Sequence, residues 1–223
     1  QNIFGLNRTM AHASHTLVLR LAGAVAASAG FGLIAAAAWP QASLWLAIGL
    51  GFLFGTSFIG GTGYRIIIAA MTGKRTAAPA SWSGATAGAA LFALLLWGIV
   101  RVSGGDGSPV LLGFGVGINI AYLLAKTACV SAGCCHAVPE KRLPMDLRAV
   151  EIAGTLLMLA AAAALAPLNM RLAAAVATGG HLLVRLMSRW TRGRWSWGWP
   201  PLRQPGAEIA PLVIMVIVCL APF

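Results

Sequence analysis

Apolar runs of about 20 residues recur along the whole chain, and each run is long enough to cross a bilayer as a single helix. This recurrence limits the possible folds more than any other feature. Hydrophobic residues make up 59% of the 223 positions and charged residues only 9%. A soluble domain of this size does not bury so much apolar surface. The sequence therefore predicts an all-α, polytopic membrane protein.

Polar or Pro- and Gly-rich breaks divide these runs into seven candidate spans. The spans cover residues 15–38, 42–64, 82–102, 109–131, 148–166, 170–187 and 206–222. Small residues within the spans permit the close helix contacts that hold bundles together in lipid. We expect a bundle of about seven transmembrane helices in a single domain over residues 1–223, with residues 1–14 peripheral or disordered.

Positive charge is distributed unevenly between the two sides of such a bundle. When the spans alternate in direction, only Arg101 and Arg171 of the 16 Lys and Arg residues fall on the opposite side. The positive-inside rule then places the crowded side, together with the N-terminus, in the cytoplasm. The net charge of +11 lies in short segments between apolar runs, where anionic lipid is the nearest counter-charge. Phospholipid is the expected partner, and nucleic acid is not.

The segment "ACVSAGCCHAVPEKRLP", residues 128–144, gathers cysteines beside a histidine. Three interpretations stay open for Cys129, Cys134, Cys135 and His136. The spacing does not match the two-residue step of a zinc knuckle, so a metal site is the weakest of them. The cysteines can pack as small hydrophobic side chains, or one can be a reactive thiolate beside the cations of this segment. We assign no metal and no cofactor.

Ionisable side chains inside the spans are costly unless they pair with one another or line a polar cavity. Lys126 and Arg185 are candidate cavity residues, although helix-end side chains of this kind can also reach out to the headgroups. Glu151 can pair with Arg148 or with Lys126. His181 can be a packing histidine or a general base.

Four short stretches carry a resemblance through their order along the chain. They are "FIGGTGYRIII", "SWSGATAGAALFALLL", "AKTACVSAGCCHA" and "VRLMSRWTR". Together they resemble the Gly-Tyr, His-Gly-Gly, signature and late arginine segments of the prolipoprotein diacylglyceryl transferase family, in its Cys-containing variant. The matching positions are Gly63, Tyr64, Gly84, Gly88, Arg185 and Arg192.

The resemblance implies an enzyme of the bacterial inner membrane. Such an enzyme moves a diacylglyceryl group from phosphatidylglycerol to the lipobox cysteine of a lipoprotein precursor and releases glycerol phosphate. On this basis we assign residues to two roles. Substrate binding is assigned to Lys126, Arg185, Arg192, Ser83 and Gly84, and catalysis to His136, Cys134, Cys135 and Glu151. The family places its N-terminus outside the cell, opposite to the side that the charge count indicates.

The chain also departs from the family pattern. Ser83 stands at the position of the family's histidine base, Gly61 and Lys126 stand at arginines, and Arg189 stands at a glutamate. The first hypothesis is a divergent transferase in which Cys134, Cys135 or His136 takes the role that Ser83 vacates. The second is a non-catalytic scaffold or accessory subunit of a larger membrane protein complex. Thiol redox or metal chemistry and transport are further alternatives.

Overall fold

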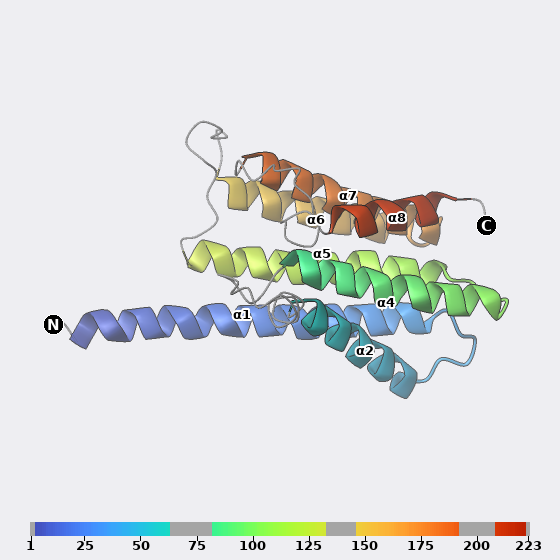
Figure 1. Cartoon of the computed structure of the whole chain (residues 1–223), viewed down its shortest axis with the longest axis horizontal. Coiled ribbons are helices and arrows are strands. Elements are labelled where there is room, and N and C mark those ends of the chain that lie inside the picture. Colours follow the sequence, from blue (N-terminus) through green and yellow to red (C-terminus); the bar gives the residue numbers. More distant parts are fainter. Residues whose placement is uncertain (1–2, 63–81, 133–145, 192–207, 222–223) are drawn as a thin grey trace, which may run out of the picture.

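The computed structural model describes residues 3–62, 82–132, 146–191 and 208–221, and every regular element in these ranges is a helix. Successive helices run in alternating directions along the bundle (Figure 1). The helices are α1 (Ile3–Ala36), α2 (Leu44–Thr62), α4 (Trp82–Val102), α5 (Ser108–Ser131), α6 (Leu147–Leu165), α7 (Met170–Thr191) and α8 (Ile209–Leu220). The predicted all-α class is confirmed.

Five of these helices are long and apolar enough to cross a membrane. They are α2, α4, α5, α6 and the part of α1 from Leu17 to Ala36. Helix α7 has sufficient length but carries three arginines and a histidine, and the described part of α8 has 12 residues. The chain is therefore an integral membrane protein, and the full count of seven spans stays a prediction.

The three short turns at one end of the bundle each carry a polar side chain that caps the following helix. The Ser43 hydroxyl accepts from the backbone N–H of Leu46 at 3.2 Å, before α2. Asp106 Oδ1 accepts from the N–H of Ser108 at 2.9 Å, before α5. Asn169 Oδ1 accepts from the N–H of Leu172 at 3.0 Å, in α7. Such caps satisfy N–H groups that the first helical turn leaves unpaired.

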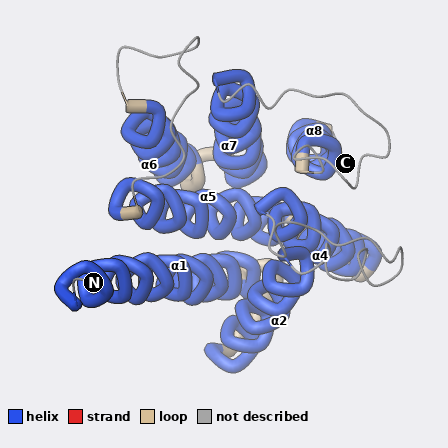
Figure 2. Tube along the Cα trace, turned by 60° about the vertical axis from the view of Figure 1, so that its left-hand side comes forward, coloured by secondary structure: helices blue, strands red, loops and turns tan. Residues whose placement is uncertain are grey.

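Helix α5 lies at the centre of the bundle. It runs between α1 on one side and α6 and α7 on the other (Figures 1 and 2). Sixteen of the 24 residues of α5 are buried, whereas most of the apolar part of α1 is not. Since α5 touches the most neighbours, its side chains connect both halves of the bundle.

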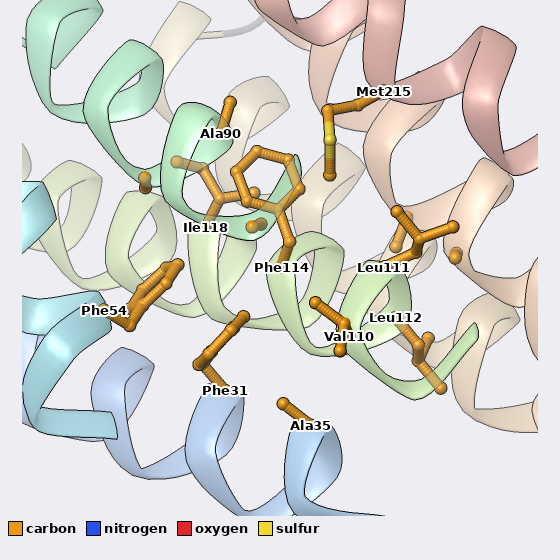
Figure 3. Close-up of a cluster of buried hydrophobic side chains, with 14 of the residues drawn as sticks. Phe31, Ala35, Phe54, Ala90, Val110, Leu111, Leu112, Phe114, Ile118 and Met215 are labelled. Atoms are coloured by element: carbon orange, nitrogen blue, oxygen red, sulfur yellow. The ribbon is translucent and has the colours of Figure 1, made fainter. Parts of the chain in front are cut away.

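The apolar core forms where α5 meets its neighbours (Figure 3). Phe31 of α1 stacks on Phe54 of α2, with ring centroids 4.4 Å apart. Phe114 and Ile118 of α5 are fully buried, as is Met215 of α8. Most of the large exposed apolar side chains lie on the helices around α5, as expected of surfaces that face lipid.

Small residues let α2 and α4 approach closely. A Cβ atom added at Gly88 of α4 would lie 2.5 Å from the backbone oxygen of Ser57 and 3.1 Å from the Cα atom of Gly61. The backbone of Gly84 packs against Gly61 in the same way. This crossing fixes the start of α4, and with it the position of Ser83.

Candidate functional site

Charged side chains meet inside the bundle toward the cation-rich end. Lys126 on α5, Glu151 on α6, and Arg185 and Arg189 on α7 are all buried, and so is Glu208, directly before α8. Together with Tyr122 and Ser83 they form a continuous set of contacts. We call these seven residues the ion network. It joins five helices through polar side chains.

The first part of the ion network is a buried ion pair between α5 and α6. Lys126 Nζ lies 2.9 Å from Glu151 Oε2. The Tyr122 hydroxyl donates to Glu151 Oε1 at 2.7 Å. Tyr122 and Lys126 are one turn apart on α5, and the Lys126 ammonium lies 5.0 Å from the Tyr122 ring centroid. Both oxygens of Glu151 are thus engaged.

The second part centres on one oxygen of Glu208. Arg185 donates to Glu208 Oε1 through Nε at 3.1 Å and through Nη2 at 2.7 Å. Arg189, one turn further along α7, donates to the same oxygen at 2.9 Å. Arg189 also donates to the Ser83 hydroxyl at 3.4 Å. Three guanidinium N–H groups therefore converge on a single carboxylate oxygen.

Tyr122 connects the two parts. Its hydroxyl accepts from Arg185 Nη1 at 3.5 Å while it donates to Glu151. The Arg185 guanidinium also lies 5.4 Å from the Tyr122 ring centroid, which is within the range of a cation–π contact. A single phenol thus links the Lys126–Glu151 pair to the arginines of α7.

The ion network holds three cations and two carboxylates, so it carries one positive charge in excess. The whole chain has only five acidic residues. Asp146 forms an ion pair with Arg148 at 2.5 Å, and Asp106 caps α5 at the other end of the bundle. Glu140, outside the described residues, is the one further acid. A buried excess of positive charge favours the binding of an anion.

A smaller group of polar side chains lies next to the ion network. Asn119 on α5 donates to the backbone oxygens of Gly115 at 2.8 Å and Ala177 at 2.9 Å. Its side chain also lies 3.3 Å from His181 Nδ1. His181 is fully buried and packs edge-on against Tyr122, with ring centroids 5.0 Å apart.

The structure brings together four of the residues that the sequence assigned to substrate binding or catalysis. Lys126, Glu151 and Arg185 all belong to the ion network. Ser83 joins them through Arg189. Gly84 lies next to Ser83, and its backbone packs on Gly61 of α2. The remaining candidates, Cys134, Cys135, His136 and Arg192, lie outside the described residues.

Three members of the ion network were not assigned as site residues from the sequence. Tyr122 stands four residues before Lys126, and Arg189 stands four residues after Arg185, so each shares a helix face with an assigned residue. Glu208 is one of only five acids in a chain with many cations. Helical spacing and the scarcity of acids were the signals that could have found them.

Metal binding finds no support in the described part of the chain, where no three His, Cys, Asp or Glu side chains gather. Cys129 is buried at the end of α5, and its backbone oxygen accepts from Arg148 at 3.4 Å. Residues 133–144 of the cysteine segment are not described, so the three interpretations of that segment stay open.

The fold and the site define a class: an all-helical integral membrane protein with a charged network buried between its helices. Neither a family model nor a curated protein nor a solved structure matches the chain. The resemblance to the diacylglyceryl transferases thus rests on the four stretches of sequence alone.

Proposed function

We propose that this protein binds the headgroup of an anionic phospholipid at the ion network. The observation that carries the proposal is the sharing of Glu208 Oε1 by Arg185 and Arg189 in a buried site whose described residues hold three cations and two carboxylates. Arginine guanidinium groups bind phosphate oxygens with the same fork geometry that they use for carboxylates. A phosphate can therefore join or replace the Glu208 carboxylate.

Lipid is the natural source of that phosphate. The helices that carry the ion network belong to a bundle whose outer surface is apolar, with side chains such as Leu156, Leu157 and Leu183 exposed. Arg189 lies two residues before the end of α7 and Lys126 five residues before the end of α5, and the ends of membrane-spanning helices approach the headgroup region. A lipid phosphate reaches this depth with its acyl chains still in the bilayer.

The resemblance described above suggests a more specific activity, transfer of a diacylglyceryl group from phosphatidylglycerol to a protein thiol. In that reaction the thiolate attacks the glyceryl carbon, the bond to the phosphate oxygen breaks, and glycerol phosphate leaves. Lys126, Arg185 and Arg189 would stabilise the negative charge on the leaving phosphate. The proton from the thiol would pass to a base, for which Cys134, Cys135 and His136 remain the assigned candidates.

Headgroup binding is tested by comparing lipids of different charge. Purified protein in nanodiscs should retain phosphatidylglycerol in preference to phosphatidylcholine, as measured by native mass spectrometry. Arg189→Gln removes one charge from the ion network and should weaken this preference about tenfold, the equivalent of ~1.4 kcal/mol. Arg101→Gln is the matched control, because Arg101 is exposed at the other end of the bundle. Equal retention of the two lipids by the unmodified protein would refute the proposal.

Transfer is tested separately from binding. Protein incubated with phosphatidylglycerol and a lipobox peptide should release glycerol phosphate, and Lys126→Ala or Arg185→Ala should abolish the release. A protein that binds the lipid selectively but releases no glycerol phosphate is a headgroup-binding protein without transferase activity.

The alternative function, a scaffold or accessory subunit of a membrane complex, is favoured by one observation. Every cation of the ion network already contacts a carboxylate of the same chain, as structural ion pairs do. Under this reading Arg189→Gln lowers thermal stability and leaves lipid preference unchanged.

We propose that the protein lies in the inner membrane of a bacterium. Expression of a tagged chain followed by membrane fractionation tests this location.

A further inference from the structure

Beside the ion network, three side chains present buried polar atoms that contact no hydrogen-bond partner within the described ranges. These atoms are Trp82 Nε1, Thr178 Oγ1 and His181 Nε2. Thr178 and His181 are fully buried. Buried polar groups in folded proteins are nearly always hydrogen-bonded, so three unpartnered atoms in one region call for a functional explanation.

The contacts of Asn119 fix which nitrogen of His181 carries the proton. Both N–H groups of the Asn119 amide donate to backbone oxygens, so its Oδ1 atom faces His181 Nδ1 at 3.3 Å. An amide oxygen only accepts, so His181 Nδ1 must donate. In a neutral imidazole the other nitrogen, Nε2, then carries a lone pair and acts as an acceptor.

The other two atoms complement this acceptor. Trp82 Nε1 is a donor only, and the Thr178 hydroxyl can both donate and accept. The rings of Trp82 and His181 lie 6.4 Å apart, each packed against Tyr122. A single hydroxyl group, like a water molecule, can accept from Trp82 Nε1 and donate to His181 Nε2.

We infer that Trp82, Thr178 and His181 form a binding site for a hydroxyl group of the lipid headgroup. This hydroxyl site rests on the proposed function and extends it. His181 lies one helical turn from Arg185 on α7, so a hydroxyl at this site and a phosphate at the arginines can belong to one headgroup. An ammonium headgroup fits poorly, because Lys126 and Arg185 would repel it.

The experiment compares two lipids of equal charge. Phosphatidylglycerol and phosphatidylethanol are both phosphodiesters with one negative charge, but only phosphatidylglycerol carries free hydroxyl groups. Native mass spectrometry of the full chain in nanodiscs should show about tenfold tighter binding of phosphatidylglycerol, as expected for one or two additional buried hydrogen bonds. His181→Phe, Thr178→Val and Trp82→Phe should each reduce this difference and leave phosphatidylethanol binding unchanged.

Thr86→Val is the matched control for these variants. Thr86 is buried on α4, and its hydroxyl already donates to the backbone oxygen of Trp82 at 3.1 Å. This variant should keep the preference for phosphatidylglycerol.

The outcomes separate the two proposals. If the unmodified protein binds both anionic lipids equally, the hydroxyl site is overturned. Water then forms the hydrogen bonds of Trp82 Nε1, Thr178 Oγ1 and His181 Nε2, and phosphate binding at the ion network stands. Loss of both lipids in all three variants also overturns it, because these residues then only support the fold. If neither lipid binds better than phosphatidylcholine, the proposed function itself fails.

Discussion

Tyr122 is the residue on which both halves of the candidate site depend. Its hydroxyl joins Glu151 to Arg185, and its ring packs against Trp82, His181 and Lys126. Phenol rings combine apolar contact with one polar end, which suits a buried position between charged groups. The arrangement of cations around one tyrosine could not be read from the sequence, since it depends on how α5, α6 and α7 are rotated.

Glu151→Gln should destabilise the fold. Lys126 would then be buried without the carboxylate that neutralises it, a change that costs about 3 kcal/mol in buried pairs. Thermal unfolding in detergent should show a clear fall in Tm. The double variant Lys126→Met, Glu151→Gln should recover much of the loss, because the uncompensated charge is gone. Additive losses in the double variant would show that the two side chains are not coupled.

Glu208→Gln should raise the affinity for anionic lipid. The substitution removes one of two carboxylates and leaves Arg185 and Arg189 with an excess charge, so phosphate competes with one negative group fewer. We expect about a tenfold gain in phosphatidylglycerol binding, equivalent to ~1.4 kcal/mol. Tm should fall without lipid and recover when phosphatidylglycerol is added. Weaker binding would indicate that Glu208 positions the arginines for the lipid.

Some residues of the ion network could be predicted from the sequence and others could not. The sequence predicts Lys126, Glu151 and Arg185 as site residues, because charged groups inside apolar runs are costly to bury and usually serve a function. The pairing of Glu151 with Lys126 was one of two alternatives, and the structure selects it. Glu208 was not assigned, since nothing in the order of residues shows that α8 begins beside α7.

At the scale of helices, the boundaries were largely predictable. The span predicted over 82–102 coincides with α4, and that over 109–131 begins one residue after the start of α5. Apolar runs and their breaks determine these limits, because each helix must match the bilayer. The end of α7 lies four residues beyond the predicted 187, since polar residues that the bundle buries extend this helix.

Two glycines of α4 test the close crossing with α2. Gly88→Ala should destabilise the protein by about 1–3 kcal/mol, because the new Cβ would clash with the backbone at Ser57. Gly98→Ala is the matched control, with no atom within 4 Å of the added Cβ. The control should be neutral or stabilising, since Ala favours helix over Gly. Equal Tm values for the two variants would contradict the crossing.

At the scale of the whole molecule, the cation-rich end should face the cytoplasm. A Ser103→Cys label in the α4–α5 turn should react with a membrane-impermeant maleimide added from outside the cell, in a background with Cys134 and Cys135 changed to serine. A cysteine in place of Lys141 should react only after the membrane is opened. The reverse pattern would agree with the orientation of the diacylglyceryl transferases and would mean that arginines gather here for lipid binding.

The position of Glu208 in the chain has a consequence for biosynthesis. The carboxylate that pairs with Arg185 and Arg189 follows Arg185 by 23 residues, so the ribosome makes these two arginines about 1 to 5 s earlier, at 5–20 residues per second. During that interval the membrane insertion of α7 is unfavourable, because Arg185 and Arg189 lack the carboxylate that pairs with them. We therefore expect the insertion of α7 and α8 to be coupled, and we expect a chain that ends before Glu208 to be degraded by membrane proteases.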